Sequence, residues 1–224
     1  MKLKLATVAV ALALTACGST KSPTAGLDGG AITPINAQKL TSNFKRRGIK
    51  VEFECAWGTG AFGLTDAMCV KTDLKAIEVT DYAASFGNSE AQRENAFRKA
   101  EMGAKAKLRR FLSEEVNTSQ VKTTFAKNVE KANDRIKQRI NANEEVEMAD
   151  DEAAKETNWA VRENTNEAVE TLTQTIRVNA AGILRGVRVS DAVVVDRQTV
   201  QVTIRWDKDT DRAAEVLRRR FDSR

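Results

Sequence analysis

A long run without glycine or proline, between Gly103 and Gly182, constrains this chain most strongly. Such a run favours long helices, because these two residues are the usual helix breakers. Two apolar stripes repeat within it at spacings of three and four. The first holds Val121, Phe125, Val129, Ala132, Ile136 and Ile140, and the second holds Val161, Ala168, Leu172, Ile176, Ala180 and Ile183. We expect two helices that fold back near residues 141–144 as a hairpin, the alternative being one extended helix that a partner stabilises. The second helix is expected to end at Gly182.

Segments with a period of two flank this helical region on both sides. Apolar and charged residues alternate over 49–55, and a second alternating segment surrounds Ile77 and Val79. After the helical region, residues 187–195 and 200–206 flank a turn at 196–199. Alternation of this kind predicts strands that bury one face, and the last two segments predict a hairpin.

A helix over 89–116 is predicted to cover the sheet. Ser89 and Gln92 fit a capping box, and Ala100, Gly103 and Ala104 would permit close approach to the strands. Its apolar stripe holds Phe97, Ala100, Ala104, Leu108, Phe111 and Leu112. We therefore predict an α+β fold: a small, mainly antiparallel sheet with an Ala-rich packing helix and a long helical-hairpin insertion over about 113–165. A last short helix is expected, capped by Thr210 and carrying Ala214, Leu217 and Phe221.

The first residues predict export. Lys2 and Lys4 precede a short apolar run over 5–14, which ends in two small residues before Cys17. This pattern resembles a bacterial lipoprotein signal, which implies cleavage before Cys17 and lipidation of its sulfur; the alternative is an ordinary secretory signal. We expect a signal peptide over 1–16, a lipidated flexible tether over 17–47 that contains both prolines of the chain, and one domain over 48–224.

The other two cysteines, Cys55 and Cys69, form an even pair. In an oxidising compartment we expect them to form a disulfide worth about 3 kcal/mol, the alternative being two buried thiols. The chain has no histidine, which excludes Ser-His-Asp and Cys-His catalysis and removes a common metal ligand. Without Lys2 and Lys4 it keeps 34 basic and 31 acidic residues, a net charge of +3 that does not require a nucleic-acid partner. We expect no enzyme activity and no cofactor.

Gly58, Gly60 and Gly63 match the G-x-G-x-x-G pattern of dinucleotide sites. That fingerprint needs a strand buried on both faces and then a long helix. Here the strand carries Glu52 and Glu54, and too few residues follow for a crossover helix. We interpret the segment as a disulfide-braced loop. The acidic stretch 144–152 lacks the spacing of a calcium loop, so no metal site is predicted.

Basic residues are concentrated in the predicted helix over 89–116. Arg98, Lys105 and Arg109 are candidates for binding an anionic partner, such as lipid headgroups or peptidoglycan. The interpretation we favour is a solvated face that pairs with the acidic stretch. Trp159 lies among polar residues and is a candidate contact between subunits, whereas Trp57 and Trp206 are expected in the core or at an interface.

Two further segments resemble a known family. They are 101–112 (EMGAKAKLRRFL) and 184–191 (LRGVRVSD), the latter followed by the strand that ends at Trp206. Together with the signal, they are similar to the small outer-membrane lipoproteins that include the FlgP-like flagellar proteins. The resemblance spans 75–112 and 165–207. It implies a periplasm-facing, non-enzymatic structural protein that assembles into rings or discs. Gly18, where aspartate would favour inner-membrane retention, indicates the outer membrane.

Overall fold

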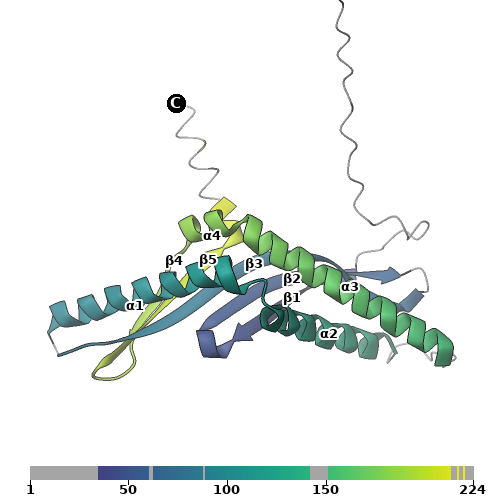
Figure 1. Ribbon diagram of the computed structural model, residues 1–224, viewed down its shortest axis with the longest axis horizontal. Coiled ribbons are helices and arrows are strands. Elements are labelled where there is room, and N and C mark those ends of the chain that lie inside the picture. The colour runs from purple at the N-terminus through teal and green to yellow at the C-terminus, as the bar shows by residue number, and fades with distance from the viewer. Residues whose placement is uncertain are drawn as a thin grey trace, which may run out of the picture. The chain divides into compact units, whose positions relative to one another are not determined.

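The computed structural model describes residues 35–60, 63–87, 89–141 and 151–212, together with positions 216 and 219. Its centre is a five-stranded, fully antiparallel sheet in the order β1-β2-β3-β5-β4 (Figure 1). The strands are β1 (Ile35–Phe44), β2 (Ile49–Gly60), β3 (Gly63–Ala84), β4 (Arg188–Val194) and β5 (Thr199–Asp207). The predicted α+β class with an antiparallel sheet is confirmed.

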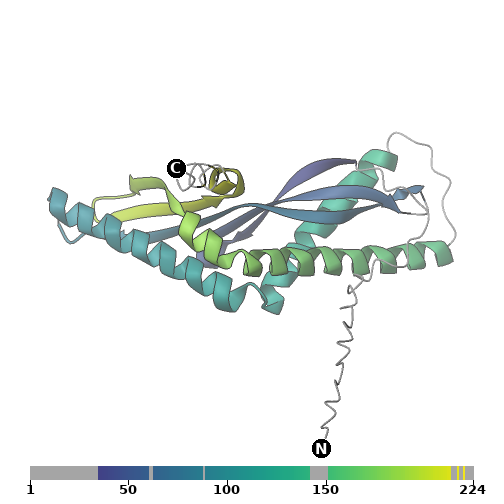
Figure 2. The same ribbon diagram turned by 90° about the horizontal axis from the view of Figure 1, so that it is seen from above.

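Helices cover one face of this sheet. They are α1 (Glu90–Arg110), the short π-helical turn η2 (Phe111–Glu115), α2 (Ser119–Asn141), α3 (Asp151–Val178) and α4 (Ala180–Gly186), and a 3-10 turn η1 (Lys45–Arg47) joins β1 to β2. Seen from above, α1 and α3 follow one another along one side of the strands (Figure 2). Helix α1 packs against β3 and β5, while α2 and α3 pack against β3. The fold therefore has two layers.

The core lies between these layers. The alternating residues Ile49, Val51, Phe53, Cys55 and Trp57 of β2 are all at most 3% exposed. Four phenylalanine rings connect the first two strands to the helices: Phe44 of β1 packs against Phe111 and Phe125, and Phe53 of β2 packs edge-on against Phe125. The apolar face of the alternating strands thus packs against the apolar stripes of the helices, which repeat every three to four residues, as the sequence predicts.

Strand β1 corrects the predicted tether. Residues 35–44 were expected to belong to the flexible segment 17–47, but they pair with β2 as an edge strand. Phe44 is buried, and Ser42 is fully buried and accepts a hydrogen bond from Asn128 at 2.7 Å. The apolar positions of β1 are few, so its pairing depends on the neighbouring strand and not on its own pattern. The domain therefore begins before residue 48.

Helices α2 and α3 form the antiparallel hairpin that was predicted, not one extended helix. Asn133 of α2 donates to Thr165 of α3 at 3.5 Å, and Lys122 pairs with Glu170. Their apolar stripes are buried against the domain's own sheet, with Leu172 and Ile176 at most 1% exposed. The hairpin is consequently part of the core.

Two predicted helix ends were wrong. Gly182 does not end the second helix, because α3 stops at Val178 and Gly182 lies inside α4. The last helical segment begins at residue 208, and the Asp207 carboxylate accepts the backbone N–H groups of Asp209 and Thr210. Asp207, and not Thr210, therefore supplies the capping oxygen. Of the apolar residues expected on that helix, Ala214, Leu217 and Phe221 lie outside the described residues.

Helix α1 begins at the predicted capping box, with Ser89 and Gln92 bonded reciprocally. Its inner stripe consists of Ala96, Ala100, Ala104 and Leu108, all buried. Gly103 faces β3 so closely that a Cβ there would overlap the Asp81 carboxylate. Asp81 cannot simply move aside, since its other oxygen accepts a hydrogen bond from Lys107 at 2.6 Å. A side chain at 103 would therefore displace the Asp81 carboxylate from Lys107.

We predict that Gly103→Ala has a free energy of unfolding about 1–2 kcal/mol below that of Gly182→Ala, because both gain helix propensity but only the methyl group at 103 displaces the Asp81 carboxylate from Lys107. Gly182→Ala is the matched control, since a Cβ at 182 meets nothing within 4 Å. The control should be neutral or stabilising, because alanine is the better helix former. Urea denaturation of both variants measures the difference, and equal midpoints would contradict this packing account.

Candidate functional site

The outer face of α1 carries the three predicted cationic candidates. Arg98, Lys105 and Arg109 are separated by seven and four residues, so they lie on one side of the helix, with Met102 between them. All four are exposed, and Met102 is 63% exposed. Across its length α1 holds seven basic residues against three acidic ones. The structure thus brings the three candidates onto one solvent-facing surface, which we call the basic stripe.

Carboxylates on the same helix partly neutralise the basic stripe. Arg98 pairs with Glu94 and Lys105 pairs with Glu101, both at 2.6 Å. Among the described residues, no carboxylate pairs with Arg109. Exposed pairs of this kind contribute little stability and can exchange for another anion. The stripe is therefore a weakly paired cationic surface centred on Arg109.

Three other bases of α1 contact groups within the domain. Lys107 pairs with Asp81 of β3, and Arg110 pairs with Glu115 at 3.2 Å. Lys99 lies over the ring of Phe86 at 5.8 Å. These partners differ from the acidic stretch expected for this helix. Residues 144–150 of that stretch lie outside the described residues, as do the side chains of Asp151 and Glu152.

A second charged cluster, which the sequence analysis did not single out, lies on the sheet face opposite the helices. Glu52 of β2 is its centre and is 5% exposed. Its carboxylate receives Lys39 from β1 at 2.8 Å, Lys50 at 2.7 Å and Arg205 from β5 at 3.2 Å. Arg205 also pairs with Glu78 of β3 and, at 3.2 Å, with Asp207. We call this set of residues the sheet-face network.

Register explains how Arg205 reaches across an intervening strand. Arg205 of β5 lies opposite Glu78 of β3. Glu52 of β2 lies opposite Ala76, which is two residues before Glu78 in β3. The small side chain at Ala76 leaves room above the strand for the guanidinium to extend diagonally. The alternating sequence predicts that these charged residues lie on the outer face of the sheet. It does not predict which of them pair, because the pairing depends on the order of the strands.

The sheet-face network sets the ionisation of Glu52. Burial on its own raises the pKa of this carboxyl, but hydrogen bonds from Lys39, Lys50 and Arg205 outweigh burial and lower the pKa to about 2. The hydrogen bond to Glu52, with a second one to Glu78, raises the pKa of the Lys50 ammonium group. The charges of the sheet-face network balance, and its cations already donate to its own carboxylates. Few donors therefore remain for a ligand, which favours a structural role.

Cys55 and Cys69 form a disulfide, with Cα atoms 5.6 Å apart. The pair joins β2 to β3, near the end of the sheet where the G-x-G-x-x-G residues lie. Gly58 and Gly60 belong to β2 and Gly63 begins β3, with Gly60 opposite Gly63. The segment is a β-hairpin, so it does not have the strand–turn–helix geometry that the dinucleotide fingerprint requires. The predicted loop is shorter than expected, because both strands extend into it.

Trp57 and Trp206 lie in the core, at 0% and 4% exposure. Trp159 belongs to α3, but its side chain lies outside the described residues, as does Cys17. Across the described ranges, no cluster of three acidic or cysteine residues could hold a metal ion. Within the same ranges, no helix has the length and apolar character needed to cross a bilayer.

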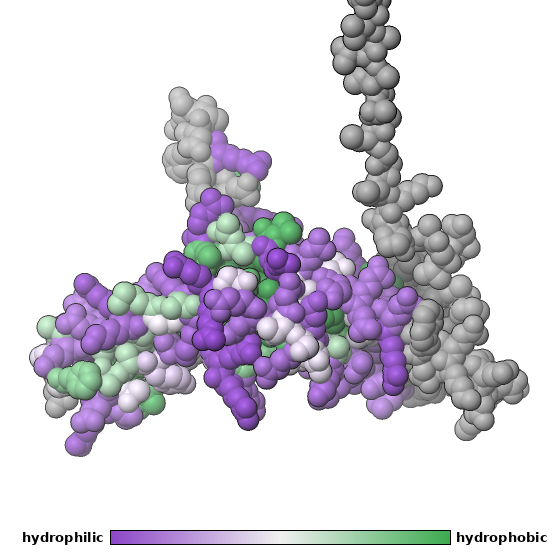
Figure 3. Space-filling model, in the orientation of Figure 1, coloured by the Kyte–Doolittle hydropathy of each residue, from purple (hydrophilic) through white to green (hydrophobic). Residues whose placement is uncertain are grey.

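The end of the sheet where α1 begins exposes apolar side chains. Figure 3 shows hydrophobic residues at this end of the molecule, interspersed with hydrophilic ones. The exposed apolar residues are Tyr82, Phe86, Val193, Val194 and Val195, between 40% and 80% exposed. We call them the apolar end. Val193 and Val194 are consecutive in β4, so they lie on opposite faces of the sheet. The run Val193–Val195 in the sequence departs from period two, and three consecutive apolar residues in a strand are a signal of an exposed apolar surface that the sequence analysis did not use.

We predict that Glu52→Gln destabilises the domain by about 2 kcal/mol at neutral pH, because three cations lose their shared carboxylate. The folded-state pKa of Glu52 lies below its ordinary value of 4.5. Its contribution is therefore complete above about pH 4.5 and is lost as the pH falls toward 2. Urea midpoints of the wild type and the variant should converge over that interval.

Glu54→Gln provides the control for this pH dependence. Glu54 lies on the same strand and face, but it is 35% exposed, and within the described ranges it pairs only with Lys75. Its replacement should cost about 0.5 kcal/mol or less. A difference between wild type and Glu52→Gln that stays constant from pH 7 to pH 2 would contradict the electrostatic role.

No family model, no curated protein and no solved structure matches this chain.

Proposed function

We propose that this chain is a lipid-anchored envelope protein with a structural or assembly role, held at the outer membrane through Cys17 and facing the periplasm. The basic, apolar and small-residue order of residues 1–17 supports the anchor. Anchoring by more than one acyl chain is stable, whereas a single chain binds reversibly. The segment before β1 supplies a tether between the lipid and the domain.

The apolar end carries the assembly role. Small soluble domains rarely expose several large apolar side chains together unless that surface meets a partner. Here Phe86 is 80% exposed and Val194 is 51% exposed, although Val200, Val202 and Ile204 of the neighbouring strand β5 are at most 2% exposed. Assembly of copies into a ring or disc, or contact with another envelope protein, would cover this surface.

The cysteine pair agrees with this compartment. A disulfide between β2 and β3 persists in an oxidising environment such as the periplasm. A non-catalytic role agrees with the composition, since the chain has no histidine for the commonest general acid–base chemistry. These two points support the location and the class of function separately from the apolar end.

We expect Cys17→Ala to move the protein out of the outer-membrane fraction, because the thioether attachment point is lost. Ser19→Ala, two residues further on, is the control and should stay in that fraction. Labelling with a palmitate analogue gives a second readout that does not depend on signal cleavage: the wild type should take up label and Cys17→Ala should not. Label on Cys17→Ala would contradict the anchor.

A second candidate function is a binding module for peptidoglycan or another anionic envelope component. The basic stripe favours it, because Arg109 has no carboxylate partner in the described part of the chain and the pairs of Arg98 and Lys105 are exposed. Long-range attraction between such a stripe and an anionic polymer weakens with salt.

For this candidate, replacing Arg98, Lys105 and Arg109 by glutamine should abolish salt-sensitive pelleting with isolated sacculi. The matched control replaces Lys127, Lys131 and Arg135, three exposed bases of α2 at the same kind of spacing. Equal pelleting of both triple variants would show that binding depends on net charge and not on the basic stripe.

A further inference from the structure

The turn between η2 and α2 carries an acceptor pattern for asparagine-linked glycosylation. Asn117 is followed by Thr118 and Ser119, which fits N-x-[ST], the pattern that oligosaccharyltransferases modify in exported proteins. Of the thirteen asparagines in the chain, Asn117 alone has serine or threonine two positions later. Glu115 stands two residues before it, and bacterial enzymes of this class also read an acidic residue at that position. Residues 115–119 therefore fit the longer, bacterial form of the pattern.

The folded domain leaves the acceptor side chain in solvent. Asn117 lies in a turn and is exposed, as is Ser119, the first residue of α2. Within the described part of the chain, neither side chain has a hydrogen-bond partner. The residues between and before them serve the fold: Val116 is 1% exposed, and the Thr118 hydroxyl accepts the Val121 N–H at 3.4 Å. A glycan on Asn117 would therefore extend into solvent without displacing a core side chain.

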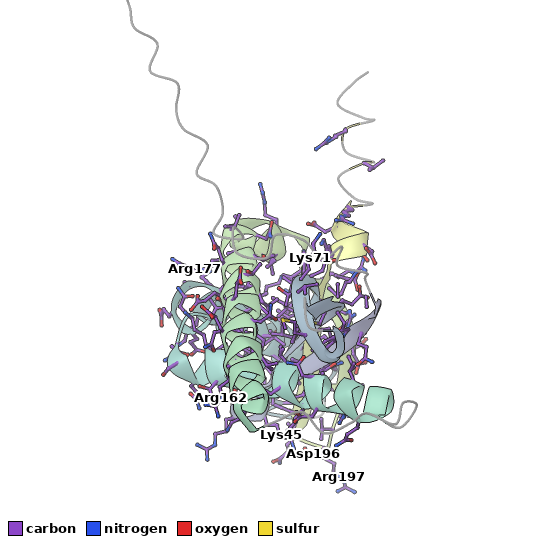
Figure 4. The ribbon with its side chains drawn as sticks, turned by 90° about the vertical axis from the view of Figure 1, so that its right-hand side faces the viewer. Lys45, Lys71, Arg162, Arg177, Asp196 and Arg197 are labelled. Atoms are coloured by element: carbon purple, nitrogen blue, oxygen red, sulfur yellow. A yellow bond between two sulfur atoms is a disulfide. The ribbon has the colours of Figure 1, made fainter. Side chains whose placement is uncertain are left out.

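The acidic member of the pattern, in contrast, is engaged in the folded domain. Glu115 pairs with Arg47 of η1 at 2.7 Å and with Arg110 at 3.2 Å, and its side chain is 17% exposed. Arg47 also donates to Gln120 at 3.0 Å, so η1 packs at the start of α2. In Figure 4, Lys45 of the same turn lies at the lower side of the molecule, where α2 also runs. An enzyme that reads this carboxylate must therefore meet the chain before η1 and α2 come together.

We propose that Asn117 is an N-glycosylation site, modified during export before the domain folds. This inference rests on the proposed export of the chain. The donor is an oligosaccharide linked to a lipid through a diphosphate. The Asn117 Nδ2 attacks the anomeric carbon of the first sugar, so that an N–C bond forms and the C–O bond to the diphosphate breaks. The amide gives up one proton, and the lipid diphosphate leaves.

Peptide mass spectrometry of the full lipidated chain, purified from the cells that naturally make it, tests the site. Trypsin cleaves after Arg110 and Lys122 and releases residues 111–122 as one peptide. The wild-type peptide should carry the added mass of an oligosaccharide, and Asn117→Gln should abolish it. Ser119→Ala should also abolish it, whereas Ser119→Thr should keep it, because either hydroxyl fits the pattern.

Asn95→Gln is the matched control. Asn95 is exposed on α1 but has phenylalanine two positions later, so its replacement should leave the glycan unchanged. A wild-type peptide without added mass, or an added mass that persists in Asn117→Gln, would overturn the site.

A purified bacterial oligosaccharyltransferase with its lipid-linked donor tests the timing. It is offered the folded full chain, and the same chain as it is diluted out of urea. The refolding chain should gain about tenfold more glycan or better, because the folded chain presents the whole pattern only when it opens locally. Equal transfer to both would overturn modification before folding.

Palmitate labelling at Cys17 separates this inference from the proposed function. A chain that takes up palmitate but carries no glycan overturns the glycosylation site and leaves the anchor standing. A chain that carries the glycan but no palmitate supports the site and contradicts the anchor, and a chain with neither overturns both.

Discussion

The fold depends on one short stretch of β3. This strand pairs with β2 along its first part and with β5 over Ala76–Ala84, so the two ladders overlap only between Ala76 and Val79. The sheet-face network lies over this overlap and connects Glu52 on one side to Arg205 on the other. On the opposite face, Ile77 and Val79 are fully buried under the helices. Electrostatic pairing and apolar burial thus act on the same few residues to hold the two parts of the sheet together.

Helix packing then determines which surfaces remain for function. Over the part of the chain whose side chains the structure describes, the inner stripes of α1, α2 and α3 pack on the sheet. Within that part, the basic stripe on α1 and the apolar end around β4 are exposed surfaces. A tether from the membrane would allow either surface to reach a neighbour without changing the domain. The α2–α3 hairpin, in contrast, serves chiefly to complete the core.

Local patterns predicted much of this architecture. The capping box at Ser89 and the alternation over 49–55 depend on neighbouring residues alone, and both are confirmed. The need for small residues at Ala100 and Gly103 was also predicted, although its cause, the Asp81 carboxylate, lies in a distant strand. Strand β1 was missed because its pairing comes from β2 and its own apolar pattern is weak. The contacts of Arg205 with Glu52 were missed because they require the strand order β2-β3-β5.

The exposed apolar end could have been predicted in part. Three consecutive valines at 193–195 do not suit a strand with one buried face. Whether a helix covers them depends on which strands α1 packs against, and these are β3 and β5. The basic stripe was predicted as a surface, whereas its pairing with carboxylates of the same helix was not. In both cases the sequence shows the residues that form the surface. It does not show which residues lie next to them in space, and those neighbours determine their role.

Crosslinking of two differently tagged copies of the unaltered chain in intact cells, followed by mass spectrometry, tests the central claim most directly. The account predicts links between copies that join their β4–β5 ends, together with links to other envelope proteins. Links confined to peptidoglycan or to scattered neighbours, with none between copies, would contradict an assembly role and favour a binding module.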